Sequence, residues 1–263
     1  MSSEENTSRP EASASCTGSS DETSSEHWIE LKGSKDFSRL LYTNPVCLLT
    51  TVNEISSPRQ NVMVVSWLTA TNNQGKFMMS INKNRHSAQI LTLKESNVEF
   101  VLCVPVAGME TLVKNVGSVS GKWGKSKFWK DDPIAQDDDS KSDQNKASNK
   151  KKRRRFQNGI EGLHTVEIGS SMQEPKSESE LFAVKGTVAH LKCCTYRIVD
   201  GKDGSAIDED HHLILCEVKA AFVQSQYWNE EKKRFQPKCK DVSPYLTFFG
   251  SQAFGYVVSE HDS

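Results

Sequence analysis

The stretch NVMVVSWLTATNNQGKFMMSINKNRHS, from Asn61 to Ser87, decides the fold. It contains two runs in which apolar and polar residues alternate, joined by the polar turn Asn72–Gly75. This alternation predicts β-strands at Asn61–Ala70 and Lys76–Asn82, and the turn residues predict a hairpin between them. In the first strand we expect one face to carry Val62, Val64, Ser66 and Leu68, and the other face Met63, Val65, Trp67 and Thr69.

The pattern changes from period two to a helical period immediately after this hairpin. Ala88, Ile90, Leu91 and Leu93 fit a short amphipathic helix, for which Ser87 is well placed as the N-cap. A helix start exposes unpaired N–H groups and a partial positive charge, so it is a natural anion site, and Arg85 adds a charge just before it. The alternative interpretation is an ordinary cap beside a solvated Arg85 and His86.

The remaining apolar runs are short and mostly strand-like. A helical stretch at 35–42 precedes a β-rich run at 46–52, and a second helical pattern covers Gly108–Val116. Further strands are expected at Asn97–Pro105, Leu181–Val199, His211–Gln226 and Tyr245–Val258. Many short strands with two or three small helices predict a mainly β fold, a closed or nearly closed barrel. The chain has neither a G-x-G-x-x-G motif nor a P-loop, so any bound nucleotide is held in another way.

Composition limits the compartment and the class of partner. The 263 residues carry a formal net charge of −1, which argues against a globally basic nucleic-acid binder. The start of the chain is polar and acidic, and no apolar run approaches the roughly 20 residues that span a bilayer. We therefore expect a protein of the cytoplasm or nucleus. The seven cysteines show no C-x-x-C spacing, and most lie in apolar runs, where a reduced cysteine packs as a small hydrophobe.

Two segments have too little to bury for a packed core. Residues 1–26 form an acidic, Ser-rich tail that we expect to be disordered. Residues 130–158 pass from an acidic block into a basic one and form a charged, disordered insertion within a single domain at 27–258. This insertion contains Lys150–Arg155, six consecutive cations. The run is a solvated charge block at minimum, and it also fits a nuclear-localisation signal or a nucleic-acid patch.

Several segments together resemble the flavin reductase-like family. In order along the chain they are NPVCLLTTV, NVMVVSWLTA, MSINKNRHSAQIL, VEFVLCVP, SGKWGKSKF, DHHLILCEV and YLTFFGSQAFGYV. The resemblance covers roughly residues 35–257, interrupted by the charged insertion. It implies an FMN-binding split β-barrel of Greek-key type, with a few short helices, that forms a homodimer.

The resemblance also assigns residues to the flavin. In the family, an arginine and a hydroxyl residue at a strand–helix junction hold the FMN phosphate, and these match Arg85 and Ser87. A strand edge binds the isoalloxazine ring, because this flat ring needs hydrogen bonds at its pyrimidine end. The full set of cofactor-binding residues that the resemblance implies is Ser66, Trp67, Leu68, Thr69, Ser80, Asn82, Arg85, His86, Ser87 and Lys127.

The resemblance implies an NAD(P)H-dependent flavin reductase, with NADH or NADPH as electron donor. Two alternatives stay open: an FMN-binding electron carrier or flavin store without NAD(P)H turnover, and a nuclear interaction protein on a degenerate barrel. Hydride transfer is the chemistry of the flavin itself, so no catalytic residue is demanded. His211, in the D-H segment, is a candidate near the flavin, with a structural histidine as the alternative. Glu217 is expected to pair with a lysine or arginine, because burying its charge alone is costly.

Overall fold

The computed structural model describes residues 27–33, 46–53, 58–94, 96–123, 126–129, 158–177, 179–199, 209–250 and 253–259. Three predictions lie outside these residues: the disordered tail at 1–26, the helix at 35–42, and the charged insertion apart from its last residue. No helix within the described ranges is long and apolar enough to cross a membrane.

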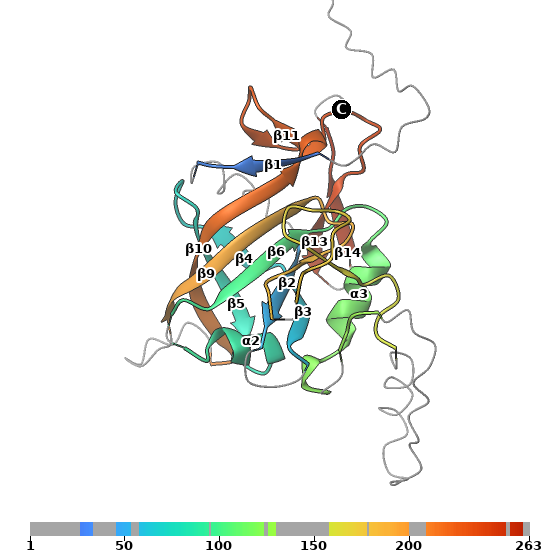
Figure 1. The fold of residues 1–263 in the computed structure, drawn as a ribbon. Coiled ribbons are helices and arrows are strands. Elements are labelled where there is room, and N and C mark those ends of the chain that lie inside the picture. The colour runs from blue at the N-terminus through green and yellow to red at the C-terminus, as the bar shows by residue number, and fades with distance from the viewer. Residues whose placement is uncertain are drawn as a thin grey trace, which may run out of the picture.

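An eight-stranded antiparallel sheet forms most of the molecule (Figure 1). Seven strands follow the order β3-β2-β6-β9-β10-β5-β4, and β1 pairs with β10. The strands are β1 Trp28–Leu31, β2 Cys47–Val52, β3 Gln60–Val65, β4 Leu68–Ala70, β5 Lys76–Asn82, β6 Glu99–Val104, β9 Ala189–Val199 and β10 His211–Gln224.

Smaller elements surround this sheet. The two α-helices of the described chain are α2 (His86–Leu91) and α3 (Glu110–Ser118). Single turns of 3-10 helix occur at η1 (Gly121–Trp123) and η2 (Ser225–Tyr227). Three two-stranded ribbons pair β7 (Thr165–Val166) with β8 (Ala183–Val184), β11 (Trp228–Asn229) with β12 (Arg234–Phe235), and β13 (Tyr245–Gly250) with β14 (Ala253–Val257). The mainly β prediction with a few short helices is confirmed.

The sheet curls until its two edges nearly meet. β3 and β4 are the opposite ends of the strand order, yet only Ser66 and Trp67 separate them in the chain. Three residue steps reach at most about 11 Å, so the two edges are within that distance where the chain crosses. The result is a nearly closed barrel, as the sequence predicts.

This crossing corrects the prediction of one continuous strand at Asn61–Ala70. β3 ends at Val65 and pairs with β2, whereas β4 begins at Leu68 and pairs with β5. The two residues between them lie in no strand, and they change the phase of the alternation. Leu68 consequently packs in the same buried cluster as Val65 rather than on the face of Val62. Closure of the barrel is a tertiary requirement that overrides local periodicity.

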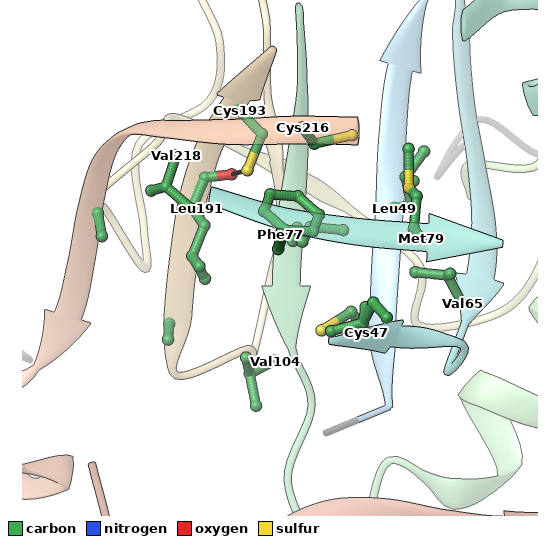
Figure 2. Close-up of a cluster of buried hydrophobic side chains, with 14 of the residues drawn as sticks. Cys47, Leu49, Val65, Phe77, Met79, Val104, Leu191, Cys193, Cys216 and Val218 are labelled. Carbon is green, nitrogen blue, oxygen red and sulfur yellow. Dashed lines mark hydrogen bonds between the residues drawn. The ribbon is translucent and has the colours of Figure 1, made fainter. Parts of the chain in front are cut away.

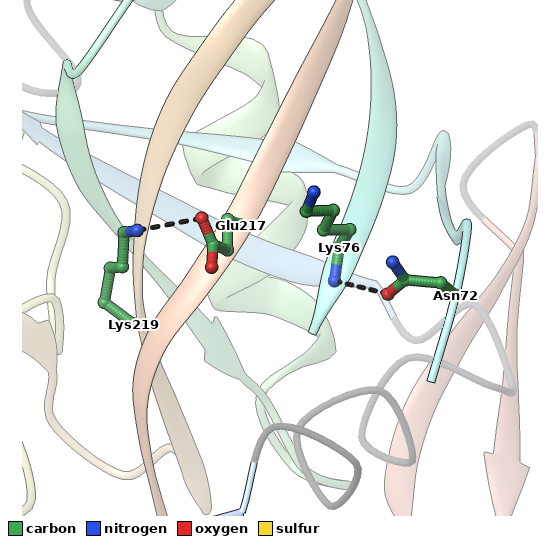
Figure 3. Close-up of polar contacts among 4 residues, drawn as sticks. All are labelled: Asn72, Lys76, Glu217 and Lys219. Atoms are coloured by element: carbon green, nitrogen blue, oxygen red, sulfur yellow. Dashed lines mark hydrogen bonds and ion pairs between the residues drawn. The ribbon is translucent and has the colours of Figure 1, made fainter. Parts of the chain in front are cut away.

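The predicted hairpin turn between β4 and β5 is present. The Asn72 side-chain oxygen accepts hydrogen bonds from the backbone N–H groups of Gln74 (2.8 Å) and Lys76 (3.1 Å), and Figure 3 shows the latter. Gly75 has φ of 83°, a conformation that glycine adopts without the steric penalty of a side chain. Asn72 and Gly75 therefore each meet a specific requirement of the turn.

Two apolar clusters form the core. The first fills the barrel with side chains from its strands, including Phe77, Phe100 and Met79, and Figure 2 shows part of it. The rings of Phe77 and Phe100 meet edge to face at 6.3 Å between centroids. The second cluster lies between the sheet and α3 and includes Val113 and Phe182. The barrel is therefore a packed core in this region, held by side chains from strands distant in sequence.

The cysteines that the structure describes form no disulfide with one another, and all of them except the half-buried Cys239 are buried. Cys47, Cys193 and Cys216 belong to the barrel cluster, and Figure 2 shows all three. Burial raises the pKa of each of these thiols. A thiol with a raised pKa stays protonated and unreactive at neutral pH, so these residues serve as small hydrophobes.

The expected partner of Glu217 is present. Lys219 donates to the Glu217 carboxylate at 2.8 Å, two residues along β10 on the same face of the sheet (Figure 3). Glu217 is half-buried rather than fully buried. The prediction of a lysine or arginine partner is confirmed.

Candidate functional site

Four basic side chains gather at the start of α2, and we call Arg85, His86, Lys122 and Lys127 the basic cluster. Figure 1 shows α2 at one end of the curled sheet, beside the end of β5. The turn from β5 to α2 is closed by the Arg85 backbone N–H, which donates to the Asn82 carbonyl at 2.9 Å. Arg85 is the N-cap residue, and its side chain is exposed.

The prediction that Ser87 caps α2 is wrong. The helix begins at His86, and Ser87 is its second residue, with no side-chain cap bond at the N-terminus. The closed turn before Arg85 starts the helix earlier than the apolar pattern indicates. Ser87 is instead buried, and its Oγ accepts a hydrogen bond from Asn61 Nδ2 at 2.7 Å. The same Asn61 nitrogen also donates to Thr51 Oγ1 at 3.2 Å.

Lys127 is the buried member of the basic cluster. Its side chain is 5% exposed, and its ammonium donates to the Val62 carbonyl on β3 at 2.6 Å. Burial, followed by the nearby charge of Arg85, lowers the pKa of Lys127 from 10.5 to about 8. The backbone of Lys127 is fixed as well, because its carbonyl accepts from Ile160 N–H at 2.8 Å.

The pKa of His86 depends on its burial and on the lysines beside it. Its pKa is lowered first by burial and then by Lys127 and Lys122, while a hydrogen bond with Gln89 opposes the shift. His86 is therefore neutral at neutral pH, and the positive charge of the cluster comes from the arginine and the two lysines. Within the described ranges none of these three cations forms an ion pair with a carboxylate. Such a concentration of unneutralised charge, one member of it buried, is suited to an anion.

Gly121 allows the segment carrying Lys122 to approach α2. A Cβ at this position would lie 2.6 Å from Asn61 Oδ1 and 2.6 Å from the His86 ring. Real Cβ atoms do not approach so closely, so with any larger residue the Asn61 amide, the His86 ring or η1 itself would have to shift. The glycine is thus required by space rather than by backbone conformation.

A second group of side chains lies where β3 crosses to β4. Trp67 is 62% exposed, and its ring lies 5.2 Å from the ring of His211 at an interplanar angle of 31°. The Trp67 carbonyl accepts from the backbone N–H of Ser80 at 2.9 Å. Trp67 is therefore a surface residue and not part of the core, although it follows an alternating strand.

The two groups lie at the same end of β5. His211 on β10 is the cross-strand partner of Asn82, the residue whose carbonyl holds the turn to Arg85. Continuous contacts therefore connect the exposed Trp67 ring to the basic cluster. The end of the barrel carries a flat aromatic surface on one side and positive charge on the other.

The structure brings some of the residues predicted from the sequence together and leaves others with no side chain available to a ligand. Lys127 interacts electrostatically with both Arg85 and His86, and Asn82 and Ser80 lie on the preceding strand β5. Thr69 is exposed and Ser66 half-buried, whereas the Leu68 side chain belongs to the core, so only its backbone is available to a ligand. Asn61, Gly121 and Lys122 were not predicted. A glycine and a lysine inside SGKWGKSKF are the only local signal for the last two.

The lowered pKa of Lys127 predicts a pH dependence for anion binding. A bound phosphate favours the ammonium and so raises this pKa in the complex. Below about 8 the ammonium is present with and without ligand, so Lys127 adds no pH dependence there. Above about 8 the free protein loses the proton, so affinity for a phosphate ligand should fall, approaching tenfold per pH unit until the pKa of the complex is reached. Phosphate monoesters, with a second pKa near 6, are already dianions there.

Fluorescence titrations of the protein with a phosphate ligand, repeated at several pH values between 6 and 10, measure how the affinity depends on pH. A Lys127→Met variant should lack the decrease, because the titrating group is absent. An equal decrease in the variant would assign the dependence to another group.

Comparison with known proteins identifies the class. The family model described as "Flavin reductase like domain" matches residues 37–236, most of the chain. The chain therefore belongs to the flavin reductase like family. A search of curated proteins gave no match.

Solved structures of similar fold agree with this assignment. The FMN-binding domain of a flavin reductases-like enzyme from Shewanella baltica OS155 aligns with a TM-score of 0.56 at 17% identity, covering 90% of this chain and 97% of that one. The FMN-binding protein of Thermus thermophilus, with bound 1-cyclohex-2-enone, has a TM-score of 0.51 at 15% identity, covering 84% and 90%. The 2-nitrobenzoate 2-nitroreductase of Pseudomonas fluorescens has a TM-score of 0.50 at 13% identity, covering 85% of each chain. At these identities the likeness shows the fold, a split barrel.

Proposed function

We propose that the protein binds FMN at the end of the barrel between Trp67 and the basic cluster. The observation that carries the proposal is the buried Lys127 ammonium beside Arg85, with no carboxylate to neutralise either among the described residues. The donor set fits a phosphate, which accepts hydrogen bonds and carries negative charge. Membership of the flavin reductase like family supports FMN as the source of that phosphate.

Each residue has a distinct role in this proposal. Arg85, which is exposed, supplies a planar fork of donors, and Lys127 supplies a buried point charge. Ser87 supplies a hydroxyl. At the strand interruption, the backbone of Ser66 and the N–H of Trp67 lie outside the ladder of the sheet, and such groups suit the polar edge of an isoalloxazine ring. The exposed Trp67 ring, with the half-buried His211 ring against it, offers a flat surface beside it.

We further propose that the bound flavin is reduced by NADH or NADPH, which makes the protein an NAD(P)H-dependent flavin reductase. Bound FMN supplies the hydride chemistry, so the chain needs only to bind, orient and leave one face of the ring open. The proposed reaction therefore requires no acid, base or activated nucleophile from the residues of the site. His211 contributes an aromatic contact to Trp67 and not a required proton transfer.

Anaerobic addition of NADH or NADPH to the FMN complex tests the reaction. We expect the visible flavin absorbance to bleach faster than that of free FMN under the same conditions. Bleaching no faster than free flavin would overturn the reductase assignment and leave an electron carrier or flavin store, since FMN binding itself would stand.

Arg85→Ala should weaken FMN binding by about 1 to 3 kcal/mol, the loss expected when a charge-assisted hydrogen bond is removed from a partly exposed site. Riboflavin, which has no phosphate, should bind the variant and the wild-type protein equally. Arg234→Ala is the matched control, because this exposed arginine lies on the β11–β12 ribbon at the far end of the molecule from α2 (Figure 1). Equal FMN affinity in the Arg85 variant and the wild type would refute the phosphate assignment.

A further inference from the structure

Asn61 lies at the centre of the candidate site, although it precedes Ser87 by 26 residues in the chain. It is 2% exposed and sits on β3 opposite Thr51 of β2. Its side chain contacts three elements: the amide nitrogen reaches Thr51 and Ser87, and the oxygen faces Gly121 of η1. A buried amide in this position connects the barrel to α2 and to the segment that carries Lys122.

The hydrogen-bond inventory of this amide constrains Ser87. A primary amide nitrogen has two hydrogens, and the two hydroxyl oxygens of Thr51 and Ser87 receive them. The Ser87 Oγ is therefore an acceptor toward Asn61, and its own hydrogen must point elsewhere. Within the described residues the Ser87 hydroxyl donates to no other group. The Ser87 hydroxyl is thus held in place by Asn61, and its hydrogen is available to donate to a ligand.

The next residue of β3 supports the same site. The carbonyl of Val62 accepts from the Lys127 ammonium at 2.6 Å, so adjacent residues of one strand fix a hydroxyl and an ammonium of the site. β3 is also the strand whose other end leads into Ser66 and Trp67. One strand thus positions groups at both ends of the proposed flavin site.

We infer that Asn61 is a positioning residue for phosphate recognition, one that keeps Ser87 as a hydrogen-bond donor to the FMN phosphate. A serine hydroxyl rotates about its Cβ–Oγ bond, so its hydrogen can point away from a ligand unless a partner fixes it. A phosphate dianion only accepts, so a hydroxyl that has turned away contributes nothing to binding. Asn61 opposes that rotation by occupying the acceptor side of the oxygen. The inference rests on the proposed function and extends it to a residue that touches the phosphate only through Ser87.

The test compares FMN with riboflavin, which share the ring and differ by the phosphate. Asn61→Leu and Asn61→Ala are both made, because one fills the space of the amide and the other leaves a cavity. We expect each to weaken FMN binding about tenfold to a hundredfold, the range for a hydrogen bond to a charged group, with riboflavin affinity changed less than about threefold. Asn229→Ala on the β11–β12 ribbon is the matched control, with no change expected for either flavin.

A double-mutant cycle with Ser87→Ala separates positioning from packing. If Asn61 acts through the Ser87 hydroxyl, then Asn61→Leu in the Ser87→Ala background should change FMN affinity by less than about twofold. Additive losses in the cycle, or an equal loss of riboflavin and FMN affinity, would overturn the inference and leave Asn61 a structural residue.

The outcomes also distinguish this inference from the proposed function. Wild-type protein that binds neither flavin overturns both. Wild-type protein that binds FMN and riboflavin equally overturns phosphate recognition, and the inference with it, while flavin binding stands. Wild-type protein that prefers FMN, with the same preference in both Asn61 variants, overturns the inference alone.

Discussion

Lys127→Met should lower FMN affinity by roughly 2 to 5 kcal/mol, because removing one partner of a buried charge pair leaves the other without compensation. The methionine side chain is unbranched and similar in length to the aliphatic part of the lysine side chain, so the shape of the buried segment is kept. The lysine is 5% exposed and its ammonium has a single described hydrogen bond, to the Val62 carbonyl. The phosphate then becomes its natural counter-ion. The loss should exceed that of Arg85→Ala, since the guanidinium is exposed to water.

Fluorescence titration of FMN and riboflavin measures this effect directly. Lys185→Met is the matched control, because Lys185 is exposed in the turn after β8 and should leave both affinities unchanged. An affinity for FMN in Lys127→Met within a factor of about three of wild type, a difference below 1 kcal/mol, would contradict the assignment of Lys127 to the phosphate.

Phe77→Ala should destabilise the fold by about 3 to 5 kcal/mol, the usual cost of truncating a buried phenylalanine. Phe77 is fully buried on β5 (Figure 2), and within the barrel cluster it packs edge to face against Phe100 on β6. Its loss removes apolar contacts between strands that are not neighbours in the sheet. Urea denaturation followed by circular dichroism measures the change.

Leu93→Ala is the control for this experiment. Leu93 is 53% exposed, so its truncation should change stability by less than about 0.5 kcal/mol. Similar midpoints for Phe77→Ala and Leu93→Ala would contradict a packed barrel interior at this position.

The strands were predictable because their apolar and polar residues follow the local geometry of a sheet. Met79 and Phe77 alternate with half-buried neighbours along β5, and the turn before it carries an asparagine and a glycine in the positions that the hairpin requires. What local periodicity could not show is where the barrel closes. The crossing at Ser66–Trp67 depends on β3 and β4 pairing with different partners, which is a tertiary property.

The site was predictable where its residues fall in segments that resemble the family, which is how Lys127 was assigned although it is remote from Arg85 in the chain. Arg85 and His86 lie next to each other at a strand–helix junction, and the resemblance of the surrounding segments to the family, rather than the two residue types alone, indicated an anion site. The start of α2 was misplaced, because the turn from Asn82 to Arg85 is fixed by backbone hydrogen bonds that the apolar pattern does not record. Asn61 and Gly121 belong to segments remote from Ser87, and each was assigned by contacts that only the folded chain creates.

A titration of the purified protein with FMN, followed by flavin fluorescence and visible absorbance, tests the central claim most directly. We predict saturable binding of one FMN per chain, with a shifted flavin spectrum and an affinity for FMN well above that for riboflavin. An unchanged flavin spectrum and fluorescence throughout the titration would contradict the claim that this barrel holds a flavin by its phosphate.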